Sequence, residues 1–330
     1  MGGDVVPRLF MFGFEGKMPP QFILRELRKG NLFGVILFRR NIESPDQLKG
    51  LISRIRDAAG CKVFVGIDTE GGRVINLPRD ILDIPPAREI GRMAKDNPEI
   101  AYRFGREIGE ALASLGFDID FAPVADVLTN PANEVIGDRA FGEDPETVAG
   151  LASQMMRGIR DGGVLSCGKH FPGHGDTRED SHLTLPRLAH DLERLSRCEL
   201  IPFKRLIDDG IEALMTAHVI YEGVDPLYPA TLSRVIIRDL LRDRLGFGGL
   251  VFSDDLEMGA ISARYDAGEA AVAAIEAGCD VLLVCRSLAK QRQVLLAVED
   301  AISKGRLDEE RIRESHMRID HILKVKSSTN

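Results

Sequence analysis

The sequence predicts an α/β fold in which the chain forms a single (β/α)8 barrel of the TIM type. Short apolar runs of strand length alternate with amphipathic stretches of helical length, which is the pattern of parallel β/α units joined by right-handed crossovers. Eight such units fit into the 330 residues. Polar side chains directly follow most of the apolar runs, as expected where parallel strands end on one face of a barrel.

The expected strands are nearly continuous apolar segments, which indicates burial on both faces of a parallel sheet. They cover residues 9–12, 34–38, 62–67, 118–123, 164–168, 213–216, 250–253 and 281–284. The segments between them have the helical apolar period. The expected helices cover residues 21–28, 45–59, 99–115, 145–160, 192–208, 234–245, 268–277 and 288–304.

A further helix at about 308–326 is expected to pack outside the barrel. No linker rich in proline, serine or glycine divides the chain, so residues 1–330 are expected to form one domain. A doubly wound open sheet is the alternative fold, but no glycine-rich dinucleotide-binding motif supports it.

The composition argues against several classes of partner. The chain has 43 basic and 51 acidic residues, a net charge of −8 and no basic tract, which disfavours nucleic acids and anionic membranes. No apolar stretch reaches the length of a membrane span, and the N-terminus lacks a basic leader. The 5 cysteines show no CxxC spacing and are expected to be free thiols in a reducing compartment. These features favour a cytoplasmic protein.

Chemically active residue types recur at the ends of the expected strands. Because the C-terminal ends of barrel strands converge on one face, these side chains should surround one pocket. They are Arg39, Arg40, Asn41, Asp68, Asp126, Lys169, His170, His218 and Asp254.

The densest group of titratable residues follows the fifth strand. Residues 169–177 read KHFPGHGDT and residues 180–182 read DSH, with glycine and proline that exclude regular structure. Such loops on a rigid scaffold commonly carry catalysis. Metal binding by His170, His174, Asp176 and His182 is a different reading, although their spacing matches no standard zinc pattern.

Together with four other motifs, this loop resembles the family 3 glycoside hydrolases, and specifically their β-N-acetylglucosaminidase branch. The other motifs are GIDTEGGRV at 66–74, FAPVADV at 121–127, GDRAFG at 137–142 and VFSDDLEM at 251–258. The five motifs spread over most of the chain.

The resemblance implies a retaining mechanism with Asp254 as the nucleophile that forms a covalent glycosyl-enzyme. The residues alone do not separate Asp254 from Asp255. Adjacent strand residues face opposite sides, so only one of the two is expected to point into the pocket. The resemblance selects Asp254.

The resemblance also assigns the proton transfers to His182, with Asp180 as its partner. A nearby carboxylate stabilises the imidazolium and raises the histidine pKa towards the working range. The same ring would first protonate the leaving oxygen and then accept a proton from the attacking water.

Four further residues are implied to bind the sugar: Lys169 and His170 from the fifth strand, Arg139 from the fourth loop, and Asp68. Asp68 would grip hydroxyls remote from the anomeric carbon, which makes the enzyme exo-acting. Where the family usually carries arginine, this chain has Asn76. That substitution removes a second clamp on the terminal sugar and favours activity on related sugars as well.

The resulting expectation is a monomeric, cofactor-free and metal-independent exo-β-N-acetylglucosaminidase, a β-hexosaminidase that trims muropeptide fragments in peptidoglycan recycling. The absence of tryptophan, with only 4 tyrosines, suits a small pocket for one sugar better than a long aromatic cleft. The alternatives are an N-acetylglucosaminide phosphorylase, a broader β-glycosidase of the same family and a metal-dependent hydrolase.

Overall fold

Eight parallel strands form the centre of the computed structural model, which describes residues 8–178 and 185–328. A parallel bridge between Phe252 and Val281 joins the first and last strands of the sheet, and the Ser253 amide donates to the Val281 carbonyl at 2.9 Å. The sheet therefore closes, and the predicted (β/α)8 barrel is confirmed. In spatial order the strands are β11 (Leu250–Phe252), β9 (Ala213–Thr216), β7 (Leu165–Phe171), β6 (Ile119–Asp120), β3 (Phe64–Ile67), β2 (Leu32–Leu37), β1 (Phe10–Phe12) and β12 (Leu282–Val284).

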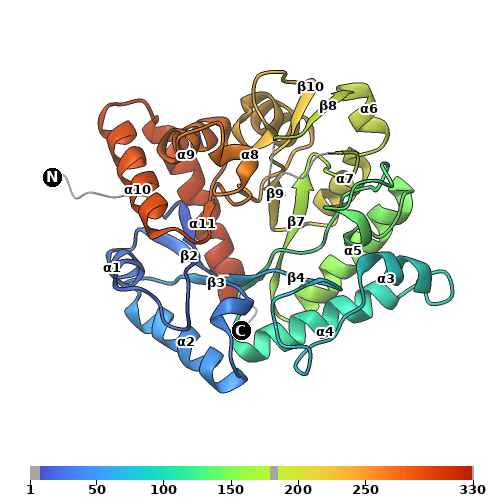
Figure 1. The fold of residues 1–330 in the computed structure, drawn as a ribbon, viewed down its shortest axis with the longest axis horizontal. Coiled ribbons are helices and arrows are strands. Elements are labelled where there is room, and N and C mark those ends of the chain that lie inside the picture. Colours follow the sequence, from blue (N-terminus) through green and yellow to red (C-terminus); the bar gives the residue numbers. More distant parts are fainter. Residues whose placement is uncertain (1–7, 179–184, 329–330) are drawn as a thin grey trace.

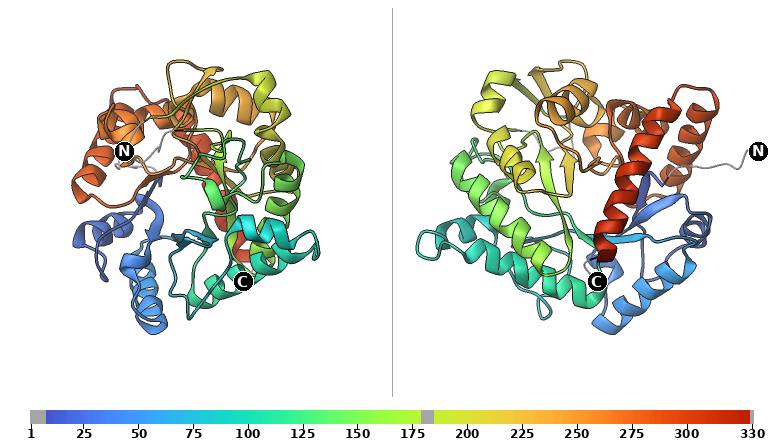
Figure 2. Two further views of the ribbon diagram at one scale, coloured as in Figure 1. Left: turned by 45° about the vertical axis from the view of Figure 1, so that its right-hand side comes forward. Right: turned by 180° about the vertical axis from the view of Figure 1, so that it is seen from behind.

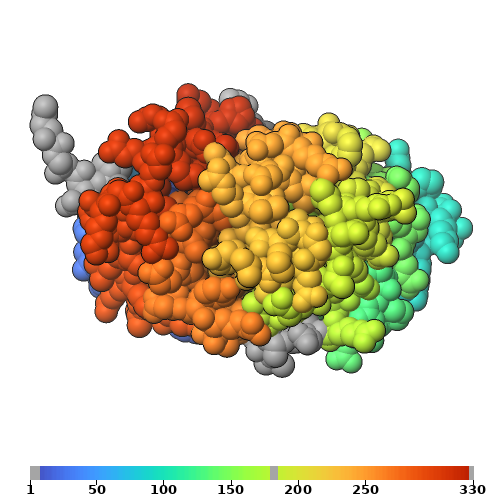
Figure 3. All heavy atoms as spheres, turned by 90° about the horizontal axis from the view of Figure 1, so that it is seen from above, coloured from blue at the N-terminus to red at the C-terminus, as the bar shows by residue number. Residues whose placement is uncertain are grey.

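Helices surround the barrel, as Figure 1 and the left view of Figure 2 show. Seen from above in Figure 3, the later segments of the chain follow one another along one flank, ending in the red C-terminal helices. No helix in the described ranges is both long and apolar enough to cross a bilayer. The surrounding helices include α1 (Gln21–Lys29), α2 (Pro45–Ala58), α3 (Ala87–Met93), α4 (Ile100–Leu115), α5 (Pro145–Asp161), α6 (Leu192–Arg197), α7 (Leu200–Asp208), α8 (Gly259–Ser262), α9 (Ala267–Ala277) and α10 (Leu288–Ser303).

Several expected elements differ from the structure. The strand expected at 164–168 continues as β7 to Phe171, so Lys169 and His170, which were expected in a loop without regular structure, belong to the strand. The helix expected at 192–208 is split into α6 and α7, because Cys198 has φ −139° and ψ −78°, outside the helical range. The helix expected at 234–245 is wound as a π-helix over Val235–Arg244. The strand expected at 118–123 is reduced to β6, although hydrogen bonds to the neighbouring strands continue through the Phe121 amide and the carbonyls of Ala122 and Pro123. Irregular pairing continues there through a bridge between Val124 and Lys169.

Two small sheets lie beyond the C-terminal ends of the barrel strands. An antiparallel hairpin of β4 (Thr69–Gly71) and β5 (Val74–Ile75) follows β3 directly. A second pair consists of β8 (Arg187–Asp191) and β10 (Ile220–Gly223). Both small sheets therefore lie on the face of the barrel where the polar residues at the strand ends were expected.

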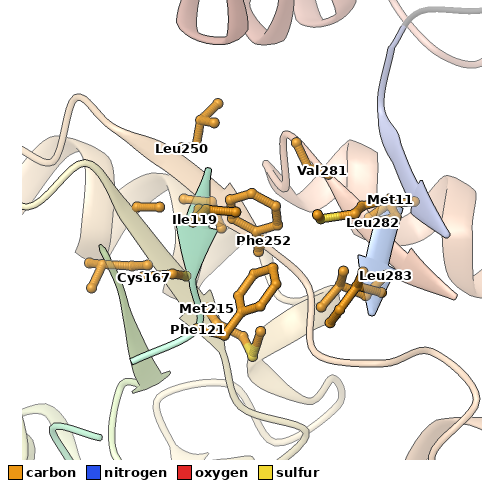
Figure 4. Packing of buried hydrophobic residues seen from close by; sticks show 14 of the residues in the cluster. Met11, Ile119, Phe121, Cys167, Met215, Leu250, Phe252, Val281, Leu282 and Leu283 are labelled. Carbon is orange, nitrogen blue, oxygen red and sulfur yellow. The ribbon is translucent and has the colours of Figure 1, made fainter. Parts of the chain in front are cut away.

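The barrel interior is filled with apolar side chains (Figure 4). Phe121 and Phe252 meet edge to face with centroids 5.3 Å apart, and Phe33 packs against Phe252 at 5.6 Å. Gly66 leaves the space that they need, because a Cβ there would lie 2.7 Å from the Met11 methyl carbon. The interior of the described barrel is thus a packed apolar core.

The opposite end of the barrel is crossed by the C-terminal helix α11 (Glu309–Ser328), visible in the right view of Figure 2. Its Arg311 donates to the carbonyls of Ile275 and Cys279 at 3.0 and 2.6 Å. Buried Asp280, which precedes β12, receives ion pairs from Arg242, Arg311 and Arg318 at 2.6 to 3.2 Å. The helix expected outside the barrel therefore covers the N-terminal ends of the strands, on the side away from the polar face.

Candidate active site

A cavity of about 920 Å³ lies at the C-terminal ends of the strands. Met215 and Leu283 belong both to its lining and to the core, so the packed interior forms its floor. This volume is typical of sites for small molecules. The polar lining consists of Asp68, Glu70, Arg73, Asn76, Asn133, Glu134, Arg139, Lys169, His170, His174, Arg178, Asp254 and Asp255.

Lys169, at the end of β7, lies between two carboxylates. Its Nζ is 2.6 Å from Asp68 Oδ1 and 2.6 Å from Glu70 Oε1. Burial by itself lowers the pKa of Lys169, but Asp68 and Glu70 more than offset this, so that the net shift is upward. Lys169 is therefore a fully charged ammonium at the wall of the cavity.

Glu70 also binds Arg139 through a two-pronged ion pair. Arg139 Nε is 2.7 Å from Oε2 and Arg139 Nη2 is 2.8 Å from Oε1. Although burial opposes ionisation, Arg139 and Lys169 hold the pKa of Glu70 well below its usual range. Glu70 was not among the predicted site residues. The sequence did contain a signal, since it follows Asp68 by two residues and so falls on the same side of an extended segment.

His170 connects this cluster to a second buried carboxylate. Its Nδ1 lies 2.7 Å from Asp126 Oδ2, and Arg139 Nη2 lies 3.4 Å from its Nε2. His170 thus links the Arg139 guanidinium to the buried carboxylate of Asp126. Burial raises the pKa of Asp126, but His170 and the amide of His174 outweigh that effect, and Asp126 stays ionised.

The segment after β7 is held tightly against the neighbouring loop. The Asn133 side-chain amide donates to the His174 carbonyl at 2.9 Å and to Thr177 Oγ1 at 3.1 Å. A Cβ at Gly175 would lie 1.8 Å from the Val127 carbonyl oxygen, so glycine is required there. Burial, followed by His170, lowers the pKa of His174 to about 4. His174 is accordingly neutral at pH 7.

Asp254 and Asp255 both line the cavity. The expectation that only one of them points into the pocket is wrong, because β11 ends at Phe252 and strand alternation no longer applies beyond it. Asp254 Oδ1 accepts from the Asp255 amide at 2.8 Å. Asp255 Oδ1 accepts from the amides of Glu257 and Cys285 at 3.0 and 3.2 Å.

The surroundings of these two carboxyl groups push their pKa values apart. Burial raises the pKa of Asp254, but the nearby rings of His218 and His170 reverse this and the net shift is downward. Burial, Glu257 and Asp254 together raise the pKa of Asp255 to about 7. At neutral pH Asp254 is therefore the ionised member of the pair, a distinction that the sequence itself did not make.

His218, from the segment after β9, forms hydrogen bonds that hold the backbone at Asp255 in place. Its Nε2 donates to the Asp255 carbonyl at 3.0 Å, and its Nδ1 lies 2.8 Å from Thr231 Oγ1. The ring is fully buried. It thus connects the segment after β9 to the two aspartates.

Asn76 occupies the position where a cation was expected from the family pattern. Its side-chain Nδ2 donates to the Asp68 carbonyl at 2.9 Å, and its Oδ1 accepts from the Arg39 amide at 3.0 Å. The amide is therefore engaged with main-chain groups of two neighbouring loops. It braces the segment that carries Asp68 and adds no charge to the cavity.

The structure brings five of the predicted site residues together around one cavity: Asp68, Arg139, Lys169, His170 and Asp254. Asp180 and His182 lie outside the described residues, and their roles stay predictions. For metal binding, no group of three or more potential ligands occurs within residues 8–178 and 185–328.

A family model matches this arrangement. Residues 15–322 match the N-terminal domain of glycosyl hydrolase family 3. The chain belongs to glycoside hydrolase family 3.

Named relatives lie in the same branch. The curated Beta-hexosaminidase of Methylobacillus flagellatus is 40% identical over 276 residues, which are 82% of this chain and 78% of that protein. A family 3 β-N-acetylglucosaminidase of Paenibacillus superposes with a TM-score of 0.95 at 40% identity, over 99% of this chain. This chain spans only 63% of the Paenibacillus chain. NagZ of Neisseria gonorrhoeae, solved with N-trifluoroacetyl-D-glucosamine, gives a TM-score of 0.81 at 31% identity, covering 98% of this chain and 97% of that one.

The raised pKa of Asp255 predicts a variant that gains stability. In the folded chain this carboxyl keeps its proton up to about pH 7, but in the unfolded chain only up to about pH 4. Wild type therefore loses stability as the pH rises between these values. Asp255→Asn should match wild type near pH 4 and exceed its free energy of unfolding by up to about 4 kcal/mol at pH 8.

Urea unfolding at both pH values measures this difference. Asp57→Asn, an exposed change on α2, is the control and should stay within about 0.5 kcal/mol of wild type. Equal destabilisation by Asp255→Asn at both pH values would mean that the carboxyl is ionised and held by its hydrogen bonds.

Proposed function

We propose that this glycoside hydrolase is a retaining exo-β-N-acetylhexosaminidase that removes terminal N-acetylglucosamine. The observation that carries the proposal is the ionised Asp254 in the lining of the same cavity as Lys169 and Arg139. Relatives named Beta-hexosaminidase at about 40% identity support this activity. The aminosugar ligand of the Neisseria enzyme supports the choice of sugar.

Asp254 would act as the nucleophile. Its carboxylate attacks C1 of the sugar, the bond from C1 to the leaving oxygen breaks, and a covalent glycosyl-enzyme forms. The lowered pKa supports this role, because a nucleophilic carboxylate has to be ionised at neutral pH. Its negative charge also stabilises the oxocarbenium-like transition state within a partly desolvated site.

His182 would move the protons, with Asp180 stabilising its charged form. The imidazolium gives its proton to the departing oxygen, and the neutral ring then takes one from the water that attacks C1. As the water oxygen bonds to C1, the bond from C1 to the Asp254 carboxylate breaks and the free carboxylate is restored. The two successive displacements retain the configuration at C1. Both residues are assigned by family resemblance.

The sugar would be held at the wall formed by Asp68, Lys169, His170 and Arg139. Charged hydrogen-bonding groups of this kind bind hydroxyls strongly. The hairpin of β4 and β5 follows Asp68 directly, which supports an exo-acting pocket closed behind the terminal sugar. None of the chain's tyrosines, all within the described ranges, lines the cavity, whose lining includes the phenylalanine Phe38. A lining this poor in aromatic rings favours a pocket for one sugar over a stacking platform for a polymer.

The natural substrates proposed are muropeptide fragments in peptidoglycan recycling, cleaved by a monomer in the cytoplasm. This part of the proposal rests on the family resemblance, with the net charge of −8 arguing against nucleic acid and anionic membranes as partners.

A substrate panel tests the proposal against its alternatives. Aryl N-acetyl-β-glucosaminide and an anhydromuropeptide are expected to be cleaved with kcat/KM at least roughly tenfold above that for aryl β-glucoside, because a site with matched polar groups rejects an analogue that lacks the acetamide. Free N-acetylglucosamine should remain the product when phosphate is added. A chelator should leave the rate unchanged.

Each departure identifies an alternative. Equal rates on the glucoside would favour a broader β-glycosidase. A sugar 1-phosphate product would show a phosphorylase, and inactivation by the chelator would show a metal-dependent hydrolase.

Replacement of the nucleophile should abolish turnover. Asp254→Asn keeps the shape of the side chain but removes its charge, and kcat should fall on the order of 10³-fold or more. In wild type, a slow 2-fluoro sugar with a good leaving group should form an adduct that peptide mapping places on Asp254. Asp57→Asn is the matched control with unchanged kcat. A label on Asp255, or active enzyme without an adduct, would contradict the assignment.

The proton donor has a distinct kinetic signature. His182→Ala should slow substrates with poor leaving groups by about 10²-fold or more, but affect activated aryl substrates much less, since those need little protonation. The two kcat/KM values are measured side by side. Equal losses on both would refute the acid role of His182.

A further inference from the structure

Two buried cations and two carboxylates meet at the sugar-binding wall. Lys169 contacts Asp68 and Glu70, and Arg139 contacts Glu70 through both prongs. The Lys169 and Glu70 side chains are each only 3% exposed. The charges of these four groups sum to zero.

A third carboxyl group, that of Asp120, lies beside these four charges and stays neutral, which indicates that the two cations are already neutralised. Asp120, at the end of β6, is fully buried; its Oδ1 accepts from the Thr69 amide at 2.8 Å, and its Oδ2 has no partner in the described part of the chain. Burial, and the carboxylates of Asp68 and Glu70, raise its pKa well above normal despite the opposing effect of Lys169. Asp120 therefore stays neutral beside a cation that is already matched.

Within the described residues, the other charged groups near this wall are paired, negatively charged or exposed to solvent. Arg73 is paired with Asp138 at 2.8 Å. Asp126 carries a buried negative charge beside His170, and Asp254 is ionised in the lining of the same cavity. Arg178 lines the cavity but is exposed to solvent, where its charge is screened.

We propose that Glu70 determines specificity: by matching the second buried cation it keeps this wall free of net positive charge, so the pocket accepts uncharged terminal sugars and rejects those with phosphate, sulfate or carboxylate groups. Lys169 and Arg139 could otherwise form an anion site, since together they present an ammonium and a planar guanidinium to the same space. The Glu70 carboxylate forms ion pairs with both of these cations. It acts through its two partners as a positioning residue. The inference rests on the proposed function, because it places a sugar against this wall.

Direct binding measurements test this separately from catalysis. The dissociation constants of N-acetylglucosamine and N-acetylglucosamine 6-phosphate are measured by calorimetry, and their ratio is compared between variants. Glu70→Gln keeps the shape and removes the charge. It should shift the ratio towards the phosphate sugar by roughly tenfold or more, because one unit charge a few ångströms away is weakly screened in this environment.

Two further variants isolate the charge. In Glu70→Gln, Asp120 is free to ionise and replace the lost charge, so the double variant with Asp120→Asn should show the full shift. Glu70→Asp keeps the charge but is one methylene shorter and cannot reach both cations. It should weaken binding of N-acetylglucosamine without any gain for the phosphate sugar. Asp57→Asn is the control for net charge.

The outcomes separate the two hypotheses. If wild type binds neither sugar, the proposed substrate class fails. If wild type binds N-acetylglucosamine but the ratio is unchanged in the double variant, the role of Glu70 is refuted. An equal gain for the phosphate sugar in Glu70→Asp would also refute it, since loosened geometry would then explain the effect.

Discussion

The site depends on a row of contacts among polar side chains, which begins with the charged groups of Asp68, Lys169, Glu70 and Arg139 and ends at His170. Each member contacts its neighbours in the row, and Asp126 and the Val135 carbonyl are further partners of His170 and Arg139. Their contacts therefore fix the ends of β3 and β7 and the loop after β6 relative to one another. The barrel brings the ends of the strands to one face, and the contacts between charged groups hold their side chains in position there.

The surroundings of Asp254, also in the cavity lining, differ from this row of paired charges. Asp254 has no ion pair with a cationic side chain in residues 8–178 and 185–326, and instead accepts a hydrogen bond from the next amide. The cations are thus neutralised where a sugar would be gripped, and a carboxylate is left available where positive charge would develop. Asp255, kept protonated up to about pH 7, prevents a second negative charge from forming beside it.

The barrel and the convergence of Asp68, Lys169, His170 and Asp254 followed from the sequence, because both depend on local patterns. Continuous apolar runs identify strands, and residues just beyond parallel strands share one face. The pairing of Glu70 with Arg139 did not follow, since the two are 69 positions apart and meet only in the folded chain.

Other differences arose where a local rule stopped applying. Strand alternation was extended to Asp255, three residues beyond the end of β11, where the backbone has already turned. A single helix was expected across Cys198, whose dihedral angles interrupt it. The helical period also does not distinguish an α-helix from the π-helix over Val235–Arg244.

The solid interior under the cavity has an evolutionary consequence. With Phe33, Phe121 and Phe252 packed together in the barrel interior, deepening the pocket would disrupt the aromatic contacts that join β2, β11 and the segment after β6. Selection for longer or bulkier ligands would have to act on the loops at the rim. The depth of the pocket is therefore set by the barrel core, whereas its width can change through the loops at the rim.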